Sequence, residues 1–178
     1  RRAYTAALTL FLLLLAAGCE QAPVHGPPSG TLMIIGGSAS RANYAQFIEL
    51  AGGPEARIVV VPTAGGRTEY DGEAIRQRWA DRYGARDVHV LHTTDPAVAD
   101  TDSFASVLYA ADAVYFLGGR QWRLVDAYAG TQTEEAFHEL LARGGLIAGS
   151  SAGASIQASF LARGAEQGNA LMIAPEEE

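Results

Sequence analysis

Five short apolar segments, separated by stretches with helical periodicity, constrain the fold of this 178-residue chain more than any other feature. Their β-branched and apolar composition predicts buried strands at residues 32–35, 58–61, 88–91, 114–117 and 146–148. The intervening patterns predict helices at about 43–50, 70–83, 122–128 and 134–143. Continuous apolar strands that alternate with helices are typical of a parallel sheet covered on both faces. We therefore expect an α/β fold in three layers, with a doubly wound, mostly parallel sheet.

Glycine-rich segments follow four of the predicted strands, at residues 36–38, 62–66, 118–121 and 149–153. In a doubly wound fold, binding and catalytic sites form beyond the carboxyl ends of the strands. We expect these four segments to converge there.

The segment Gly149-Ser150-Ser151-Ala152-Gly153 is a G-x-S-x-G motif between a strand and a helical pattern. A serine on such a sharp turn needs small neighbours, because a side chain at either flanking glycine would collide with the strand or the helix. The motif marks Ser151 as a candidate nucleophile. The same turn directs the Ala152 N–H toward the position where an oxyanion would form.

The pair Gly118-Gly119 has two interpretations. Without a Cβ, its backbone N–H groups can approach a ligand and complete an oxyanion hole with Ala152. Alternatively, the glycines only make a tight turn, and the spacing alone does not separate these interpretations. Gly36-Gly37-Ser38 fits neither G-x-G-x-x-G nor the Walker pattern, so no nucleotide site is predicted.

From about residue 30 to 178, the chain resembles the cyanophycinase and dipeptidase E group of serine peptidases. The fold of this group is similar to that of class I glutamine amidotransferases, which is flavodoxin-like. Four segments carry the resemblance: Gly36-Gly37, Val61-Pro62-Thr63-Ala64, Phe116-Leu117-Gly118-Gly119-Arg120-Gln121, and Ala148-Gly149-Ser150-Ser151-Ala152-Gly153-Ala154.

The resemblance implies a peptidase in which Ser151 is the nucleophile, Gly119 and Ala152 are the oxyanion donors, and Gln121 contacts the substrate. Members of the group cleave β-aspartyl-arginine polymers or dipeptides with an N-terminal aspartate. We therefore expect hydrolysis of aspartyl or isoaspartyl peptide bonds, with a peptide as substrate.

Two departures from the family pattern change this expectation. Arg120 stands where cyanophycinases usually have Asp, and an arginine favours an acidic substrate group over a guanidinium. The family's catalytic His and its carboxylate partner lie downstream of the serine helix, and this chain ends before them, so we expect a domain that is incomplete at its C-terminus.

The four histidines of the chain are the candidates for a replacement base. His25 lies in a predicted tether, His138 on a helix and His89 within a strand. Only His92, at a strand end, could approach the site, and a local hydrogen-bond role is favoured for it. Roles as caps or solvated charges are likewise favoured for Asp112, Asp126 and Glu134.

Two other functions remain open. A catalytically incomplete binding module would use Arg120, Gln121 and the glycine N–H groups to hold small acidic peptides. An α/β-hydrolase esterase shares the G-x-S-x-G motif but is disfavoured because no H-G-G-G-like loop precedes the serine.

The N-terminal segment has the features of an export signal. Arg1 and Arg2 precede an apolar stretch and the sequence Leu15-Ala16-Ala17-Gly18-Cys19, which resembles the bacterial lipobox. Because Cys19 is the single cysteine, it has no intramolecular disulfide partner. We expect a signal peptide at 1–18, a lipidated Cys19 with a tether at 19–30, and a domain at 31–178, anchored to a membrane on the periplasmic or cell-surface side. The alternative is an ordinary signal peptide followed by an incidental cysteine.

Composition limits the remaining partners. The chain carries a net charge of −7, which disfavours a nucleic-acid partner. No His, Cys or acid pair has convincing metal-ligand spacing, and no cofactor is implied. A homodimer is left open, since the sequence does not reveal the oligomeric state.

Overall fold

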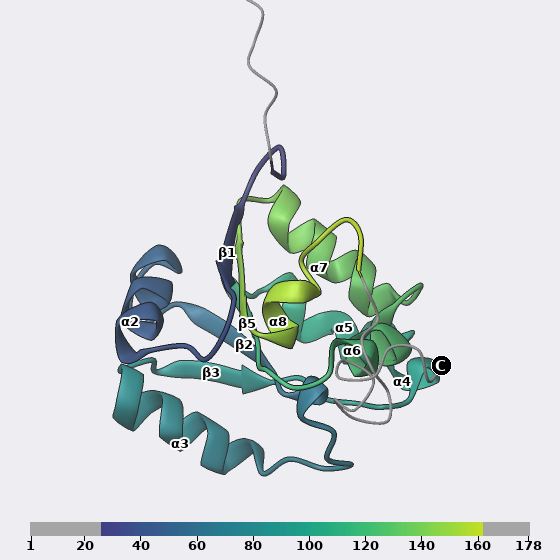
Figure 1. Ribbon diagram of the computed structural model, residues 1–178, viewed down its shortest axis with the longest axis horizontal. Coiled ribbons are helices and arrows are strands. Elements are labelled where there is room, and N and C mark those ends of the chain that lie inside the picture. Colours follow the sequence, from purple (N-terminus) through teal and green to yellow (C-terminus); the bar gives the residue numbers. More distant parts are fainter. Residues whose placement is uncertain (1–25, 162–178) are drawn as a thin grey trace, which may run out of the picture.

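The computed structural model describes residues 26–161, which form a five-stranded sheet with helices on both sides (Figure 1). All four strand pairings are parallel, and the order across the sheet is β1-β5-β4-β2-β3. The strands are β1 (Thr31–Ile35), β2 (Arg57–Val61), β3 (Asp87–Val90), β4 (Ala113–Phe116) and β5 (Leu146–Ser150). The predicted α/β class and the five predicted strands are confirmed, with bounds shifted by one or two residues.

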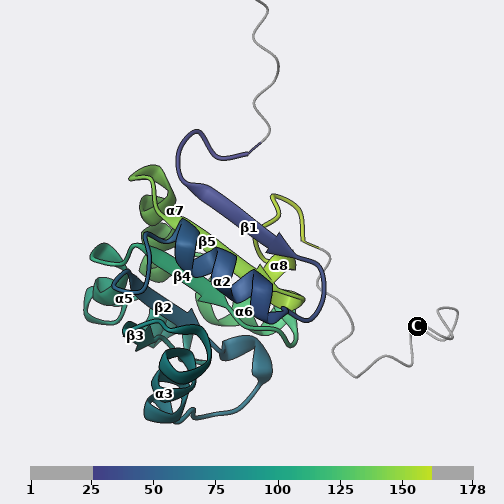
Figure 2. The same ribbon diagram turned by 90° about the vertical axis from the view of Figure 1, so that its left-hand side faces the viewer.

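Helices cover both faces of this sheet, as the two perpendicular views show (Figures 1 and 2). Helices α2 and α3 pack on one face, and α4 to α8 on the other. The sequence patterns predicted α2, α3, α6 and α7 but missed α4 and α5. The helical elements are α2 (Arg41–Leu50), η1 (Thr63–Gly65), α3 (Gly72–Tyr83), α4 (Pro96–Ala99), α5 (Asp102–Tyr109), α6 (Gln121–Tyr128), α7 (Gln132–Ala142) and α8 (Ala152–Ser155).

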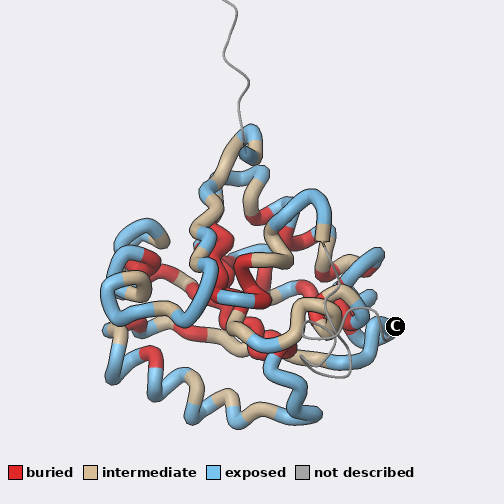
Figure 3. The backbone as a smooth tube through the Cα atoms, in the orientation of Figure 1, coloured by how far each residue is buried: buried red, intermediate tan, exposed pale blue. Residues whose placement is uncertain are grey.

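The burial of strand β2 explains why residues 58–61 are all apolar. Val59 and Val61 belong to the core under α4 to α8, whereas Ile58 and Val60 belong to the core under α2 and α3. All four side chains are fully buried, and the buried tube segments are concentrated in the sheet (Figure 3). A strand covered on both faces needs apolar side chains at odd and even positions alike.

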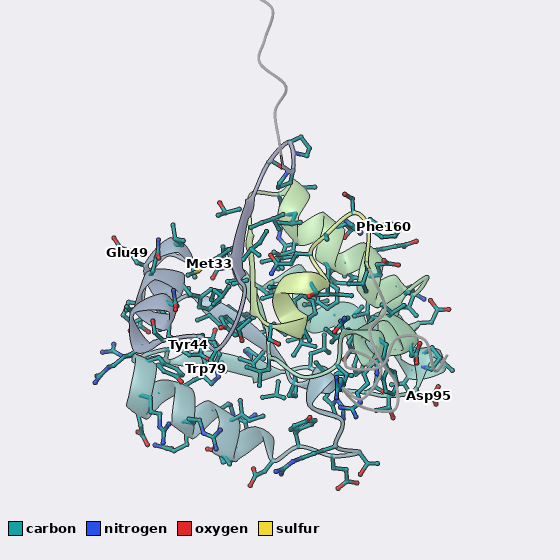
Figure 4. All side chains as sticks on the ribbon, viewed as in Figure 1. Met33, Tyr44, Glu49, Trp79, Asp95 and Phe160 are labelled. Carbon is teal, nitrogen blue, oxygen red and sulfur yellow. The ribbon has the colours of Figure 1, made fainter. Side chains whose placement is uncertain are left out.

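An aromatic cluster fills the space between the sheet and α2 with α3. Tyr44 of α2 stacks on Tyr83 of α3 at 3.9 Å between ring centroids, and Trp79 packs edge-on against Tyr44 at 5.4 Å (Figure 4). Tyr115 of β4 also stacks on Tyr44. Burial raises the pKa of both the Tyr44 and the Tyr115 hydroxyl. These rings pack both helices onto the strands that carry the site.

The residues before β1 contact the end of α7. The Ser29 hydroxyl lies 3.1 Å from the Leu141 carbonyl and 2.7 Å from that of Ala142. Gly30 has a φ of +77°, and a Cβ there would lie 2.6 Å from the Leu141 oxygen. These two residues of the predicted tether are thus held against the domain. Between residues 26 and 161, no helix combines the length and the apolar character needed to cross a bilayer.

Candidate active site

Ser151 occupies a strained turn between β5 and α8. Its φ of 54° and ψ of −114° make it the one non-glycine residue with positive φ in the described part of the chain. Its N–H donates to the Ile35 carbonyl at 2.9 Å, and its own carbonyl accepts from the N–H groups of Ala154 and Ser155. These bonds hold the backbone while the residue remains exposed at the carboxyl edge of the sheet. Such backbone strain at an exposed serine is typical of a functional position.

The flanking glycines of the motif are required by sterics. A Cβ on Gly149 would lie 2.3 Å from the Gly153 carbonyl oxygen, and one on Gly153 would lie 2.1 Å from the Phe116 carbonyl oxygen. Both obstacles are backbone atoms, which cannot rotate away. The turn therefore brings α8 against β4 and β5 more closely than any side chain would permit, as a strand-to-helix turn around a nucleophile requires.

The loop after β4 lies beside the serine. A Cβ on Gly118 would be 3.4 Å from the Cβ of Ser151. Gly119 has a φ of +148°, and a Cβ on it would lie 2.0 Å from the Ala64 carbonyl oxygen. Glycine is thus needed at position 119 because the loop packs closely against η1. This packing agrees with the interpretation that the glycine pair makes a tight turn.

The η1 turn holds the other side of this loop. The Ala64 carbonyl accepts hydrogen bonds from the Arg120 N–H at 2.9 Å and from Arg123 Nη1 at 3.0 Å. These bonds join the segments after β2 and β4, and the Ser151 N–H bond to the Ile35 carbonyl joins the ends of β5 and β1. The segments after β2, β4 and β5 lie together as predicted, and the bond from Ser151 to Ile35 places the end of β1 beside them. Gly36 and Gly37 are exposed, and a Cβ on either would meet nothing within 4 Å.

The backbone N–H groups of the two predicted oxyanion donors have no hydrogen-bond acceptor among the described residues. In residues 26–161, neither the Gly119 N–H nor the Ala152 N–H donates a hydrogen bond. Both belong to the segments that flank Ser151 in space. No described residue therefore competes with a ligand oxygen for these N–H groups.

The predicted substrate contacts lie at the start of α6. Arg120 is the residue before the helix, and Gln121 is its first residue; both are half-buried. Arg120 is attached to the site through its backbone, because its N–H donates to Ala64. The structure therefore places both residues directly after the glycine pair.

None of the described histidines contacts Ser151. His89 pairs with Asp87 at 2.8 Å, and His138 is exposed on α7. Both ring nitrogens of His92 have protein partners, Thr63 Oγ1 at 2.8 Å and the Thr68 carbonyl at 3.2 Å. His92 thus has the local hydrogen-bond role that the sequence favoured. His25 and Cys19 lie outside the described residues.

Two of the three candidate acids act as backbone caps. An Asp112 carboxylate oxygen accepts from the Arg57 N–H at 2.8 Å, and a Glu134 oxygen accepts from the Gly130 N–H at 2.7 Å. Asp126 is exposed on α6. The cap interpretation is correct for Asp112 and Glu134.

The sequence did not predict a series of hydrogen-bonded side chains behind the loop that contains Gly118 and Gly119. Tyr128 Oη lies 2.7 Å from Thr63 Oγ1, which in turn bonds His92. Burial raises the pKa of Tyr128. The one available signal was a threonine two residues after the end of β2 at Val61, since polar residues at strand ends gather on one edge of a parallel sheet.

A large groove in the described surface lies away from the serine. This groove of about 710 Å³ is lined mostly by apolar side chains, several of them from β4, β5, α6 and α7, among them Phe116, Phe137 and Ile147. Ser151, Gly119 and Arg120 do not line it. The serine turn and the glycine pair thus lie outside this groove. Within residues 26–161, no three His, Cys, Asp or Glu side chains are grouped to hold a metal ion.

Comparison with solved structures agrees with the fold. A peptidase from an acI-B1 Actinobacterium matches with a TM-score of 0.62 and 29% identity, over 75% of this chain and 58% of that one. A putative peptidase E protein from Listeria monocytogenes EGD-e matches with a TM-score of 0.50 and 21% identity, over 71% of this chain and 60% of that one, and supports the fold alone. This chain thus spans about three-fifths of the length of both.

Sequence comparison gave one family. No curated protein sequence matches the chain significantly. The model of peptidase family S51 matches residues 32–172, a range that includes the serine turn, the glycine pair and nearly all of the five strands. The chain belongs to peptidase family S51.

Proposed function

We propose that the chain carries the nucleophile and the oxyanion hole of a serine peptidase that hydrolyses aspartyl or isoaspartyl peptide bonds. The observation that carries the proposal is the strained Ser151 turn, packed against Gly118 with the N–H groups of Gly119 and Ala152 unused by described residues. Family membership supports the reaction class.

The chemistry is acyl transfer to water. Ser151 Oγ attacks the peptide carbonyl, and the oxygen that becomes negative accepts from the Gly119 and Ala152 N–H groups. A base removes the serine proton and returns it to the leaving amine, which departs as the C–N bond breaks and an acyl-enzyme remains. Water then cleaves the ester and regenerates the serine. The proposed base is a histidine downstream of the serine helix, as the family resemblance implies.

Arg120 and Gln121 are the proposed specificity residues. Their position after the glycine pair supports contact with the substrate portion next to the scissile carbonyl. A guanidinium binds a carboxylate through charge-assisted hydrogen bonds. This charge favours an acidic substrate and disfavours the arginine-containing polymer that cyanophycinases cleave.

A fluorophosphonate probe and a substrate pair test this proposal on the protein expressed from its complete coding sequence, including any codons after Glu178. The wild type should be labelled at Ser151 and should hydrolyse an isoaspartyl or N-terminal aspartyl dipeptide faster than a simple ester. Ser151→Ala should lose both activities. Faster ester hydrolysis would favour the esterase instead.

The binding-module alternative has one observation in its favour: no histidine among residues 26–161 contacts Ser151. In that case Ser151→Ala would leave the affinity for an acidic dipeptide largely unchanged, and neither protein would be labelled or turn over substrate. Reading the coding DNA past the codon for Glu178 separates the two cases, because the peptidase requires an in-frame histidine and carboxylate.

Lipid anchoring through Cys19 is proposed from the lipobox-like sequence alone. The exported protein should carry diacylglycerol on Cys19 and partition into the detergent phase of a Triton X-114 separation. Cys19→Ser should move it to the aqueous phase. A wild-type protein that stays aqueous, with an unmodified Cys19 by mass spectrometry, would contradict the anchor.

A further inference from the structure

A chain of hydrogen bonds joins three elements directly behind the glycine loop. Thr63 Oγ1 lies 2.7 Å from Tyr128 Oη and 2.8 Å from His92 Nδ1, and His92 Nε2 lies 3.2 Å from the Thr68 carbonyl. Thr63 is fully buried, and Tyr128 is 4% exposed. These hydrogen bonds therefore connect three parts of the fold: the segment between β2 and α3, His92 after β3, and the end of α6.

The direction of these bonds follows from their ends. A carbonyl oxygen only accepts, so His92 Nε2 carries the proton that binds Thr68. In the neutral imidazole Nδ1 then accepts, and the Thr63 hydroxyl donates to it. The single Thr63 proton is thereby used, so Tyr128 donates to Thr63. With His92 neutral, every proton in this series has an acceptor, and removal of the Thr63 hydroxyl would take away the acceptor of the Tyr128 proton and the donor to His92 Nδ1.

The next residue along the backbone connects this chain to the site. Thr63 is the first residue of η1, and the carbonyl of Ala64 receives the Arg120 N–H and Arg123 Nη1. The oxygen of the same carbonyl lies only 2.0 Å from the position that a Cβ of Gly119 would take. Any displacement of η1 must therefore displace the glycine loop.

We propose that Thr63 and His92 are positioning residues, which hold η1 so that the Gly119 N–H points at the oxyanion formed on attack by Ser151. This inference rests on the proposed function, because it assumes that Gly119 is an oxyanion donor. It assigns His92 a role other than general base: both ring nitrogens are engaged in holding the loop, and neither bonds Ser151.

Thr63→Val tests the proposal, because valine keeps the shape of threonine and removes the hydroxyl. A misplacement of about 1 Å at a catalytic group costs about 100-fold in rate, so kcat should fall between about 10- and 100-fold. KM should change by less than about twofold, since the contact is made in the transition state and not in the bound substrate. Rates are expressed per site titrated with the fluorophosphonate, so unfolded molecules do not contribute.

Two further comparisons complete the kinetic series. Thr63→Ser restores the hydroxyl and should recover kcat to within about threefold of the wild type. His89→Asn is the matched control for His92→Leu, because His89 lies on the strand that leads to His92 but pairs with Asp87 at 2.8 Å. His92→Leu should resemble Thr63→Val, whereas His89→Asn should leave kcat unchanged.

Amide hydrogen exchange gives a readout that needs no turnover. The Arg120 N–H, bound to Ala64, should exchange at least about fivefold faster in Thr63→Val, because η1 is no longer fixed. The Leu117 N–H donates to the carbonyl of Val61, the last residue of β2, at 3.0 Å. Its exchange rate should stay at the wild-type value.

The outcomes separate the two proposals. An unchanged Arg120 exchange rate, or a kcat per site that stays at the wild-type value in Thr63→Val, overturns the positioning role. A parallel loss of protection at Arg120 and Leu117 with normal kcat per site shows a general stability effect and also overturns it. If wild-type protein neither hydrolyses peptides nor reacts at Ser151 while Arg120 exchange responds as expected, the proposed function fails and the mechanical link from Thr63 to the loop stands.

Discussion

Gly119 lies so close to Ala64 that a Cβ on Gly119 would be 2.0 Å from the Ala64 carbonyl oxygen. The same carbonyl accepts from the backbone of Arg120, so the turn after β2 and the loop after β4 form one unit beside Ser151. The loop that carries Gly119, the proposed oxyanion donor, is thus shaped by contact with the turn after β2.

The first prediction concerns Gly119→Ala. The added methyl group would meet backbone atoms at an unfavourable φ of +148°, so the loop must move away from Ala64. We expect kcat/KM to fall by about 100-fold, as for loss of one oxyanion donor. Gly84→Ala is the control: its φ is +80°, and a Cβ at that position would meet no atom within 4 Å. It should lose about 1 kcal/mol of stability and no activity.

The second prediction uses the strain at Ser151. Its φ of 54° with ψ of −114° is accessible to glycine at little cost, whereas alanine shares the strain of serine. Ser151→Gly should therefore be more stable than Ser151→Ala by about 1 to 3 kcal/mol in urea unfolding, while both lack nucleophilic activity. Equal stability of the two variants would show that the turn is unstrained.

The third prediction concerns pH. The hydrogen bond from Arg57 holds the pKa of Asp87 below its ordinary value, and the contact with His89 acts in the same direction. A carboxylate with a lowered pKa stabilises the fold above its unfolded pKa of about 3.9, and this stabilisation is lost as the pH falls through the folded value.

Asp87→Asn should therefore lower Tm at pH 7 and have a smaller effect at a pH of about 2.5, below the unfolded pKa. The side chain is 37% exposed, so solvent screening keeps the difference small. Glu49→Gln, at an exposed position of α2, removes the same charge and should show no such pH dependence. An equal Tm decrease for Asp87→Asn at both pH values would contradict the assignment.

The fourth prediction addresses specificity. Arg120→Glu keeps the backbone N–H that binds Ala64 but reverses the side-chain charge. A charge-assisted hydrogen bond contributes about 1.5 to 3 kcal/mol, so kcat/KM for an aspartyl dipeptide should fall by about 10- to 100-fold. Hydrolysis of a β-aspartyl-arginine dipeptide should improve relative to it. The ratio of the two kcat/KM values is the measurement, and an unchanged ratio would remove Arg120 from the substrate site.

Much of the fold could be predicted because it depends on local patterns. Strand β2 is apolar at every position from Ile58 to Val61, which is typical of a strand buried on both faces. Helix α5 was missed although Phe104, Ala105 and Leu108 recur at helical spacing within its eight residues. Helix α4 has only four residues and shows no periodicity.

The sequence by itself determined the parallel α/β class, the nucleophile candidate Ser151 and the glycines around it, since strand burial and a strand-to-helix turn impose requirements on neighbouring residues. The tertiary structure decided what surrounds that serine. Thr63 meets His92 across 29 positions and Tyr128 across 65, and only the order of strands in the sheet brings them together. Hydrogen bonds between distant segments leave no periodic trace in a sequence, because each partner is chosen by the fold and not by its neighbours.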